Sequence, residues 1–434
     1  EWTFSLLTFI GVGIIIVSNF IVTIIVVPKF KKIQTLTDNI NRVTRENLTG
    51  IKVVRAFNAE NYQQNKFYCA NNELTKTNLF IGRIMALMDP VMTSVMSGIP
   101  LAIYWIGAGL INSSGVTDKI ILFSDMIVFS SYAIQVILSF TFLVMIFVIY
   151  PRASVSMGRI NEILETKESI KDGYIDKDTT NLKGVVEFRN VSFKYPDADE
   201  CVLENINFKV EKGETVAFIG STGSGKSTLI NLIPRFYDVT NGEILIDGVN
   251  IKDLKQEYLH NKIGYVSQKA ILFKGSVKSN IKFGKGNDKR ITDKEILEAL
   301  EVAQAFDFVH KMDKGIDSNI AQSGTNVSGG QKQRLQVARA IARNPEIYIF
   351  DDSFSALDFK TDYTLRKELN KISKGTTKLI VASRIGTIID ADKIMVLEDG
   401  KCVGIGKHKD LLKSCKVYQE IAASQLSKEE LDHA

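Results

Sequence analysis

Cysteine, histidine and tryptophan are scarce in this chain of 434 residues, which holds only 4, 4 and 2 of them. The cysteines are far apart in the sequence and form no Cys-x-x-Cys pair. This spacing argues against a structural zinc site and against a disulfide framework, and it is typical of a protein kept in a reducing compartment. Small buried side chains are the simplest interpretation of the four, Cys69, Cys201, Cys402 and Cys415.

An excess of one charge is also missing. The 54 Lys and Arg residues against 49 Asp and Glu leave a formal net charge of +5, scattered along the chain, which predicts no nucleic-acid partner. Residues 1–150 are mostly apolar, whereas residues 160–434 have an ordinary soluble composition. Because the sequence opens with Glu1 and runs directly into an apolar segment, we expect it to be a fragment without its N-terminal part, so the missing targeting signal excludes little.

Three segments are apolar enough to cross a bilayer, which takes roughly 20 residues as a helix. They are residues 4–27, 84–111 and 120–150. Asp89 and Asp125 are the acids within them, each near a span end. Solvation at the membrane interface is the first interpretation of these acids, and a substrate or ion role is the alternative. Helices of soluble proteins are seldom this long without a charge, which predicts an all-α transmembrane domain over residues 1–156.

The connections between the spans differ in positive charge. Residues 28–83 carry ten Lys and Arg residues, whereas residues 112–119 carry one lysine. Since positive residues gather on the cytoplasmic side, the long connection is predicted to be cytoplasmic, and the third span then returns the chain to the cytoplasm. Apolar residues between Ile40 and Phe57 recur at helical spacing, which predicts helices that extend beyond the bilayer and turn back near residues 58–61.

The second half of the chain has a different pattern. Residues 157–183 are polar and charged, which is typical of a linker. Residues 185–189 and 191–195 predict two strands, after which strands and helices alternate as in an α/β domain. We therefore predict an α/β nucleotide-binding domain over residues 184–421 and a tail over 422–434.

A phosphate-binding loop lies between an apolar strand at 215–219 and a helix at 227–233. Its pattern is Gly-x4-Gly-Lys-Ser, in which glycines let backbone N–H groups approach phosphate oxygens at the start of a helix. The lysine places its charge against the β- and γ-phosphates, and the following serine hydroxyl ligates Mg²⁺. A chance glycine-rich turn is the alternative, but strand, loop, lysine and hydroxyl all agree. The predicted ATP-binding residues are Gly220, Ser221, Thr222, Gly223, Ser224, Gly225, Lys226, Ser227 and Thr228.

A second nucleotide motif is the apolar run 347–350 that ends in Asp351 and Asp352. It predicts a buried parallel strand whose carboxyl end presents an acid. We predict that Asp351 holds Mg²⁺ through water, together with Ser227.

Between the two motifs, residues 326–334 have the sequence Asn-Val-Ser-Gly-Gly-Gln-Lys-Gln-Arg. Ser-Gly-Gly-Gln at 328–331 resembles the signature of the ATP-binding-cassette (ABC) family. Ser328 is predicted to cap a helix over 329–343 and, with the following N–H groups, to form an anion cradle. The resemblance implies that Ser328, Gly329, Gly330 and Gln331 act on a nucleotide held by a second cassette.

The resemblance assigns further residues. Tyr195 matches the aromatic residue that stacks on adenine, although a buried tyrosine at a strand end is the alternative. Gln268 matches the glutamine that contacts Mg²⁺ and faces the membrane domain, and an ordinary surface glutamine is its alternative. Residues 355–358 match a loop that crosses the dimer interface. The membrane half resembles the last three of six helices of an exporter, with 45–57 in the long intracellular loop and 58–61 as its coupling segment.

Two positions depart from the family pattern. Asp352 stands where hydrolysing members usually have glutamate as general base, and Ser383 stands where they usually have histidine. The resemblance then implies a heterodimer in which this chain's ATP site hydrolyses poorly and its signature completes the partner's site. A homodimer is the alternative. Residues 320–324 also differ from the family's usual Val-Gly-Glu-x-Gly, and their effect on coupling stays open.

The predicted function is ATP-driven export across the plasma membrane by a multi-pass ABC half-transporter. The resemblance implies amphipathic substrates such as drugs or lipids. An ATP-gated channel or regulatory subunit is the alternative, whereas an import or DNA-repair ATPase is disfavoured by the fused spans. Apolar residues could line a cavity, although packed core or lipid contact is the more common role of such side chains: Met85, Met88, Met92, Met96, Phe129 and Phe140.

Overall fold

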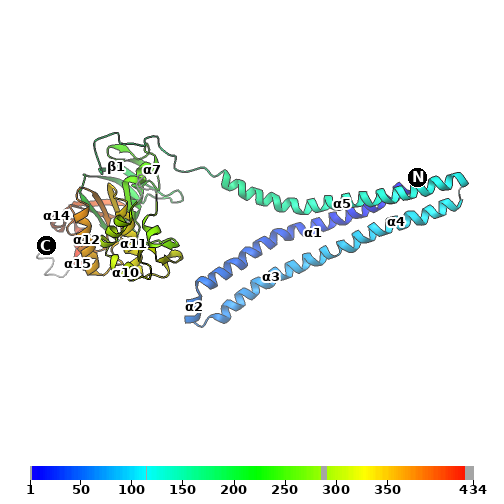
Figure 1. Ribbon diagram of the computed structural model, residues 1–434, viewed down its shortest axis with the longest axis horizontal. Coiled ribbons are helices and arrows are strands. Elements are labelled where there is room, and N and C mark those ends of the chain that lie inside the picture. The colour runs from blue at the N-terminus through cyan, green and yellow to red at the C-terminus, as the bar shows by residue number, and fades with distance from the viewer. Residues whose placement is uncertain (1, 114, 285–290, 426–434) are drawn as a thin grey trace. The chain divides into compact units, whose positions relative to one another are not determined.

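A computed structural model describes residues 2–113, 115–284 and 291–425. The chain forms two compact units, Glu1–Lys167 and Glu168–Ala434 (Figure 1). The first is entirely helical where it is described, and the second combines strands with helices. This division confirms the predicted fold class, a helical transmembrane domain followed by an α/β domain.

Long helices make up the first unit. They are α1 (Trp2–Thr49), α2 (Ile51–Ala56), α3 (Glu60–Ala86), α4 (Met88–Ser113) and α5 (Val116–Leu164). Helix α1 runs beside α3, α4 and α5 (Figure 1). With 48 residues α1 is about 70 Å long at 1.5 Å per residue, more than twice the hydrocarbon thickness, so it continues beyond the bilayer as predicted.

The described residues include three helical stretches that are long and apolar enough to cross a membrane: Trp2–Thr49, Glu60–Asn112 and Lys119–Phe140. Only a thin core is buried among them, around Phe4, Ile15 and Ile103. Most apolar side chains face outward, as Trp105 does at 82% exposure. Such a surface suits lipid as its surroundings, which supports the predicted spans.

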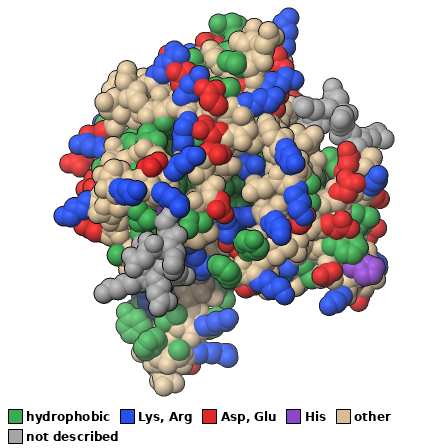
Figure 2. Space-filling view, turned by 90° about the vertical axis from the view of Figure 1, so that its left-hand side faces the viewer, with side chains coloured by type: hydrophobic (Ala, Val, Ile, Leu, Met, Phe, Trp, Pro, Cys, Tyr) green, Lys and Arg blue, Asp and Glu red, His purple; other side chains and the backbone are tan. Residues whose placement is uncertain are grey.

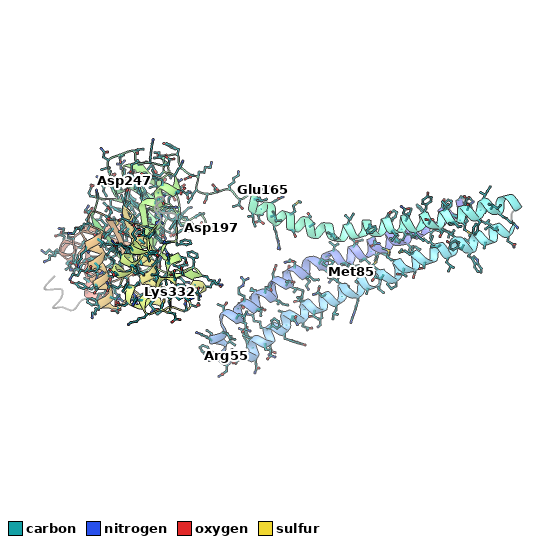
Figure 3. All side chains as sticks on the ribbon, in the orientation of Figure 1. Arg55, Met85, Glu165, Asp197, Asp247 and Lys332 are labelled. Atoms are coloured by element: carbon teal, nitrogen blue, oxygen red, sulfur yellow. The ribbon has the colours of Figure 1, made fainter. Side chains whose placement is uncertain are left out.

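Two breaks shape the connection between α1 and α3. Gly50 ends α1, and the chain leaves α2 at Phe57, where Asn58 adopts a left-handed φ of +50°. The turn predicted near residues 58–61 is therefore present, and Arg55 lies beside it (Figure 3). A third break, at Leu87, divides the span predicted as one helix over 84–111. Pro90 follows in the first turn of α4, where its missing N–H costs no helical hydrogen bond.

The predicted linker begins too early. Helix α5 continues to Leu164 and Glu165 is its C-cap (Figure 3), so residues 157–164 are helical and not linker. Only Arg159 and Glu162 are charged among them, and four of the eight side chains are apolar and exposed: Met157, Ile160, Ile163 and Leu164. The charged residues that suggested a linker begin at Lys167, after the helix has ended. The later part of the predicted linker packs on the second unit, where Ile175 pairs with Leu254 in a parallel bridge.

Two sheets organise the second unit. An antiparallel sheet has the order β2-β1-β4-β5, and a larger sheet has the order β12-β11-β3-β10-β9-β6, parallel except for β12. The strands are β1 (Val186–Phe193), β2 (Leu203–Val210), β3 (Thr215–Gly220), β4 (Asn241–Ile246), β5 (Val249–Asn250), β6 (Ile263–Val266), β9 (Ile347–Asp351), β10 (Thr377–Val381), β11 (Lys393–Glu398) and β12 (Lys401–Gly406), with a short pair β7 (Gly275–Ser276) and β8 (Asn319–Ile320) outside them.

One strand replaces the two predicted at 185–195. The pairing of β1 with β2 shifts between Phe188 and Val191, where Asn190 adopts a φ of +49°. This β-bulge lets one strand run through the position at which the two predicted strands were separated.

Helices cover the larger sheet on both faces. The helices of this unit are α6 (Lys226–Leu232), α7 (Gln256–Lys262), α8 (Val277–Ile281), α9 (Asp293–Val302), α10 (Phe306–His310), α11 (Gly329–Ala342), α12 (Phe359–Ile372), α13 (Ile385–Ile388), α14 (His408–Ser414) and α15 (Lys416–Gln425). Of these, α8 and α9 pack on α11, and α10 packs on α9. Alternate residues of the strands enter different cores, for example Ile219 on one face and Phe218 on the other. Burial on both faces explains the continuous apolar runs of β3, β9 and β10.

The register of the parallel strands positions the site. Val381 of β10 pairs with Asp351 of β9 on one side and with Phe218 of β3 on the other, and Val266 of β6 pairs with Phe350. The segments that follow β3, β6, β9 and β10 therefore leave the sheet at one edge. This is the edge where ligands bind in open α/β sheets.

On the face that Figure 2 shows, charges of both signs are interspersed over the second unit. Lys262 is one of several charged residues that are buried, and its Nζ lies 2.8–2.9 Å from carboxylate oxygens of Asp178, Asp247 (labelled in Figure 3) and Glu346. Burial lowers the pKa of Lys262, but hydrogen bonds to the three carboxylates outweigh it and raise that pKa above its ordinary value. This cluster anchors the segment after α5 to the body of the unit.

Candidate nucleotide-binding site

The loop between β3 and α6 has a backbone that only glycine allows at some positions. Gly223 and Gly225 adopt φ values of +88° and +91°. A Cβ atom on Gly220 would lie 2.0 Å from the carbonyl oxygen of Leu397, and one on Gly225 would lie 2.8 Å from Cδ2 of Leu203. The loop thus wraps tightly and leads into the N-terminus of α6, as a phosphate cradle requires.

Lys226 is folded over this loop. Its Nζ donates to the carbonyl oxygens of Gly220 and Ser221 at 2.9 and 2.6 Å and to Oγ of Ser224 at 3.3 Å. Burial lowers the pKa of Lys226, and the nearby charges of Asp352 and Asp351 oppose that shift. The ammonium group is therefore already at the mouth of the loop, where phosphate oxygens can replace the carbonyl groups as its acceptors.

Ser227 of the phosphate loop and Asp351 at the end of β9 lie side by side, although they are far apart in the sequence. Oγ of Ser227 donates to Oδ1 of Asp351 at 2.8 Å, and Asp351 is 5% exposed. Burial raises the pKa of Asp351; Ser227 opposes this rise, the charge of Asp352 adds to it, and Lys226 also opposes it. A hydroxyl and a carboxylate that meet at the sheet edge are hard oxygen ligands, so this pair fits Mg²⁺.

Gln268, the third predicted metal ligand, lies at the same edge. It is exposed just after β6. Its neighbour Ser267 is held by α11, since Nε2 of Gln336 donates to Ser267 Oγ at 2.7 Å and Nε2 of Gln333 donates to its carbonyl oxygen at 3.5 Å. Sequence reasoning missed both glutamines, because they lie after the signature motif and carry no pattern of their own.

Asp352 and Ser383 contact each other directly. Oγ of Ser383 donates to Oδ1 of Asp352 at 3.1 Å, while the backbone N–H of Asp352 bonds the carbonyl of Val381 at 3.0 Å. Asp352 has a φ of +44°, a region that Asp adopts more readily than most residues. The two positions that depart from the family pattern are thus partners in one hydrogen bond.

The signature segment forms the predicted helix cap. Ser328 Oγ accepts from the backbone N–H of Gln331 at 3.3 Å, and Oε1 of Gln331 accepts from the N–H of Ser328 at 2.9 Å. This capping box begins α11, which ends at Ala342 with Arg343 as its cap. Ser328 and Gly329 are exposed, so the start of the helix is open to an anion.

Tyr195 is half-buried between aromatic rings. Its ring meets Phe193 and Tyr237 edge-on at centroid distances of 4.8 and 5.2 Å, and its hydroxyl lies 3.1 Å from Oγ1 of Thr228. The structure thereby joins the predicted adenine-stacking residue to the end of the phosphate loop. Tyr237 was not singled out from the sequence, and stacking of Tyr195 on adenine stays a prediction.

A phosphate loop and an acid-tipped strand at one sheet edge, with a further anion cradle at the start of α11, are the features of a nucleotide-binding protein. Comparison with known proteins narrows the class: a family model described as ABC transporter matches residues 203–355, and one described as ABC transporter transmembrane region matches residues 1–155. The chain belongs to the ABC transporter family.

Similar proteins include an ABC transporter ATP-binding protein of Mycobacterium tuberculosis, with 41% identity over 98% of this chain and 72% of that protein. An ABC transporter ATP-binding protein of Bacillus subtilis has 37% identity over 92% of this chain and 68% of that protein. A putative multidrug export ATP-binding/permease protein of Staphylococcus aureus has 44% identity over 61% and 45%, respectively.

Among solved structures, a bacterial Atm1-family ABC exporter with ATP bound has a TM-score of 0.84 and 27% identity, covering 97% of this chain and 73% of that one. The protein is therefore a membrane protein of the ABC exporter type, with a cytoplasmic ATP-binding domain that drives transport. These findings confirm the predicted family, the predicted membrane location and the cytoplasmic placement of the second unit.

Proposed function

We propose that this chain is one subunit of a heterodimeric exporter whose own ATP site binds MgATP and hydrolyses it slowly. The observation that carries the proposal is the hydrogen bond between Ser383 and Asp352 at 3.1 Å. In place of a glutamate steadied by histidine, the site has a shorter acid that accepts from an uncharged hydroxyl.

The length of Asp352 limits its reach toward an attacking water. An aspartate is one methylene shorter than glutamate, which leaves the carboxylate about 1–1.5 Å short, and a misplacement of about 1 Å can cost on the order of 100-fold in rate. The hydrogen bond from Ser383 occupies one of its oxygens. Ser383 also brings no positive charge to the γ-phosphate, unlike a protonated histidine.

Binding of the nucleotide needs none of the altered residues. The backbone of the 220–225 loop and Lys226 would hold the phosphates, and Tyr195 would stack on adenine. Ser227, Asp351 and Gln268 would hold Mg²⁺, which when bound offsets the negative charge of the β- and γ-phosphate oxygens. The site is thus suited to retain ATP even where turnover is slow.

The signature segment supports the heterodimer. Ser328, Gly329 and Gln331 form an ordered, accessible helix start, so this chain can supply a complete cradle to a nucleotide on a partner. This subunit has a slow ATP site of its own and an intact cradle for a second site. It therefore pairs best with a different subunit, whose ATP site hydrolyses and is completed by this cradle. A homodimer would instead contain two slow sites.

Amphipathic molecules are the proposed substrates. The name of the Staphylococcus aureus relative, a putative multidrug exporter, supports this class, as does an apolar groove of about 480 Å³ along α1 and α4. Met92, Met96, Phe129 and Phe140 pack against the core of the membrane unit, which favours the packing role over the cavity role for these four. Asp89 is exposed in the first turn of α4, in keeping with interfacial solvation.

Phosphate release by the chain in lipid nanodiscs tests the proposal. The chain alone should bind a fluorescent ATP analogue with Mg²⁺ but turn ATP over slowly, and a suitable partner half-transporter should raise turnover. The double substitution Asp352→Glu with Ser383→His should raise turnover of the chain's own site by on the order of 100-fold.

Ser383→His alone serves as the control, because it restores the histidine without the longer acid. Fast hydrolysis by the unsubstituted chain alone would contradict the heterodimer. A double variant that binds ATP normally yet gains no turnover would contradict the argument from carboxylate reach. Because Glu adopts positive φ less readily than Asp, the melting temperature of the double variant must be measured alongside.

A further inference from the structure

Gln425, the last residue of α15, forms two hydrogen bonds with the backbone of the segment that contains Ser383. Its Nε2 donates to the carbonyl oxygen of Ser383 at 2.8 Å, and its Oε1 accepts from the backbone N–H of Ile385 at 2.9 Å. One side-chain amide therefore pairs with the backbone on both sides of Arg384, much as a neighbouring strand would. The 383–385 segment runs from the loop after β10 into Ile385, the first residue of α13, and has no sheet partner at these positions in the described residues.

The helix that presents Gln425 is firmly packed. Tyr418 and Ala422 are fully buried in the core that also contains Ile385 and Ile388, and Ile421 packs against that core. Helix α15 contacts α13, β3 and β11. The amide of Gln425 is thus carried by a helix that packs on the sheet.

The 383–385 segment also contacts Asp352 and Ser355, on the side of the site assigned to the γ-phosphate. Ser383 Oγ donates to Asp352, and Nη2 of Arg384 donates to the carbonyl oxygen of Ser355 at 3.3 Å, in the loop that follows Asp352. Arg366 of α12 donates to the carbonyl oxygens of Gly386 and Thr387 and fixes the far end of the segment. Any displacement at 383–385 is therefore transmitted to Asp352 and Ser355.

We propose that Gln425 is a positioning residue for ATP hydrolysis: it sets the backbone of residues 383–385 and through it the place of Ser383 beside Asp352. Gln425 itself lies behind the loop and contacts no residue of the phosphate loop among the contacts described above. The inference uses the proposed function only in assigning Ser383 and Asp352 to the γ-phosphate end of the site. If Gln425 has this role, changes at the end of α15 alter the rate of ATP hydrolysis without changing a residue that contacts the nucleotide.

The test compares Gln425→Ala with a matched variant of the same helix. Gln419→Ala removes a glutamine whose Nε2 donates to the carbonyl oxygen of Leu412 at 2.8 Å, away from the 383–385 loop. Both variants are made in the full chain in nanodiscs, and amide hydrogen exchange of the peptide 382–388 is followed together with kcat and KM for ATP.

Gln425→Ala should speed exchange at Ile385 by about three- to tenfold, the usual net effect of one lost hydrogen bond. It should lower kcat by a similar factor while KM and the affinity for a fluorescent ATP analogue stay within about twofold. Gln419→Ala should change none of these. Gln425→Glu keeps an acceptor for Ile385 but loses the donor to Ser383, so exchange at Ile385 should stay slow while kcat falls.

Two results would overturn the inference. One is unchanged exchange in Gln425→Ala relative to Gln419→Ala, which would show that the amide does not hold the loop. The other is faster exchange with unchanged kcat, which would show that the loop position does not matter for hydrolysis. Both comparisons are ratios between variants and hold whether the unsubstituted site is slow or fast, so a failure of the proposed function is read separately, from the absolute rate.

Discussion

Ser227 and Asp351 come from distant parts of the chain and meet at 2.8 Å, with the carboxylate nearly closed off from solvent. A buried carboxylate that keeps its charge needs a cation or hydrogen-bond donors close by. Here Ser227 supplies the donor and the nearby Lys226 supplies charge, and Mg²⁺ would take over both tasks when MgATP binds. In the proposed site, the serine hydroxyl would thus serve Asp351 without the metal and Mg²⁺ when it is bound.

We predict that Ser227→Ala weakens binding of MgATP by about tenfold, because one oxygen ligand of the metal is lost and Asp351 loses its donor. Binding of ATP in excess EDTA should change much less, since Lys226 and the loop backbone remain. Titration of a fluorescent ATP analogue with Mg²⁺ and with EDTA measures both affinities. Equal weakening under the two conditions would argue against Ser227 as a metal ligand.

The sequence allowed the main residues of the site to be named but not the residues that hold them. The loop at 220–228 and the acids at 351 and 352 follow parallel strands, and their convergence follows from that fold class. Gln425 and Gln336 are polar residues on helices, with no motif to mark them. Their contacts depend on where each helix packs in the folded domain, and the local sequence does not predict that position.

At the scale of elements, the sequence predicted which helices and strands exist better than it predicted where they begin and end. Helix α5 continues to Leu164, beyond the predicted start of the linker at residue 157, and the run of charged residues begins only at Lys167. Strand β1 passes through Asn190 with a bulge, where the sequence predicted the boundary between two strands. In both cases tertiary contacts or solvent decide between conformations that the local sequence permits equally.

Helices α14 and α15 are joined by a buried polar pair. Nδ1 of His408 lies 2.6 Å from the hydroxyl of Tyr418, and Nε2 of His408 has no partner among the described residues. Burial, with a smaller effect of Lys409, lowers the pKa of His408 below its ordinary value. A neutral imidazole therefore suits this packing and a charged one does not.

This pair predicts acid sensitivity of the second unit. Below an unfolded-state pKa of about 6.5, the unfolded chain binds a proton at His408 that the folded protein resists, so stability falls as the pH drops through that value. His408→Gln should lose less thermal stability than the unsubstituted chain between pH 7.5 and 5.5. Thermal melts followed by circular dichroism at the two pH values give the drop in melting temperature for each protein. Tyr418→Phe keeps the histidine, so its melting temperature should drop by as much as that of the unsubstituted chain. An identical loss in His408→Gln would assign the sensitivity to other groups.

At the scale of the whole molecule, the two units have separate cores and different surroundings. The thin core around Ile103 belongs to the membrane unit, and the two cores on the faces of the larger sheet belong to the second unit. Both tryptophans, Trp2 and Trp105, lie in the membrane unit. Tryptophan fluorescence therefore follows one unit alone.

We predict that MgATP stabilises the second unit selectively. A ligand at 100 times its dissociation constant adds about 2.7 kcal/mol to the stability of the domain that binds it. For a domain of this size the melting temperature should rise by about 5–10 °C. The rise should appear in circular dichroism at the second unit's transition and be absent from the tryptophan signal. A matching shift of the tryptophan signal would show that the units unfold together.

Residues 352 and 383 stand just past the tips of β9 and β10, and the loop at Asp352 is held by its backbone N–H on Val381. The sheet consequently places no packing demand on either side chain. Two codon changes outside the sheet would then be enough for a gene duplicate to pass from a fast site to a slow one, and the backbone of residue 352, with its φ of +44°, favours the aspartate. Division of labour between paired subunits is then within easy evolutionary reach.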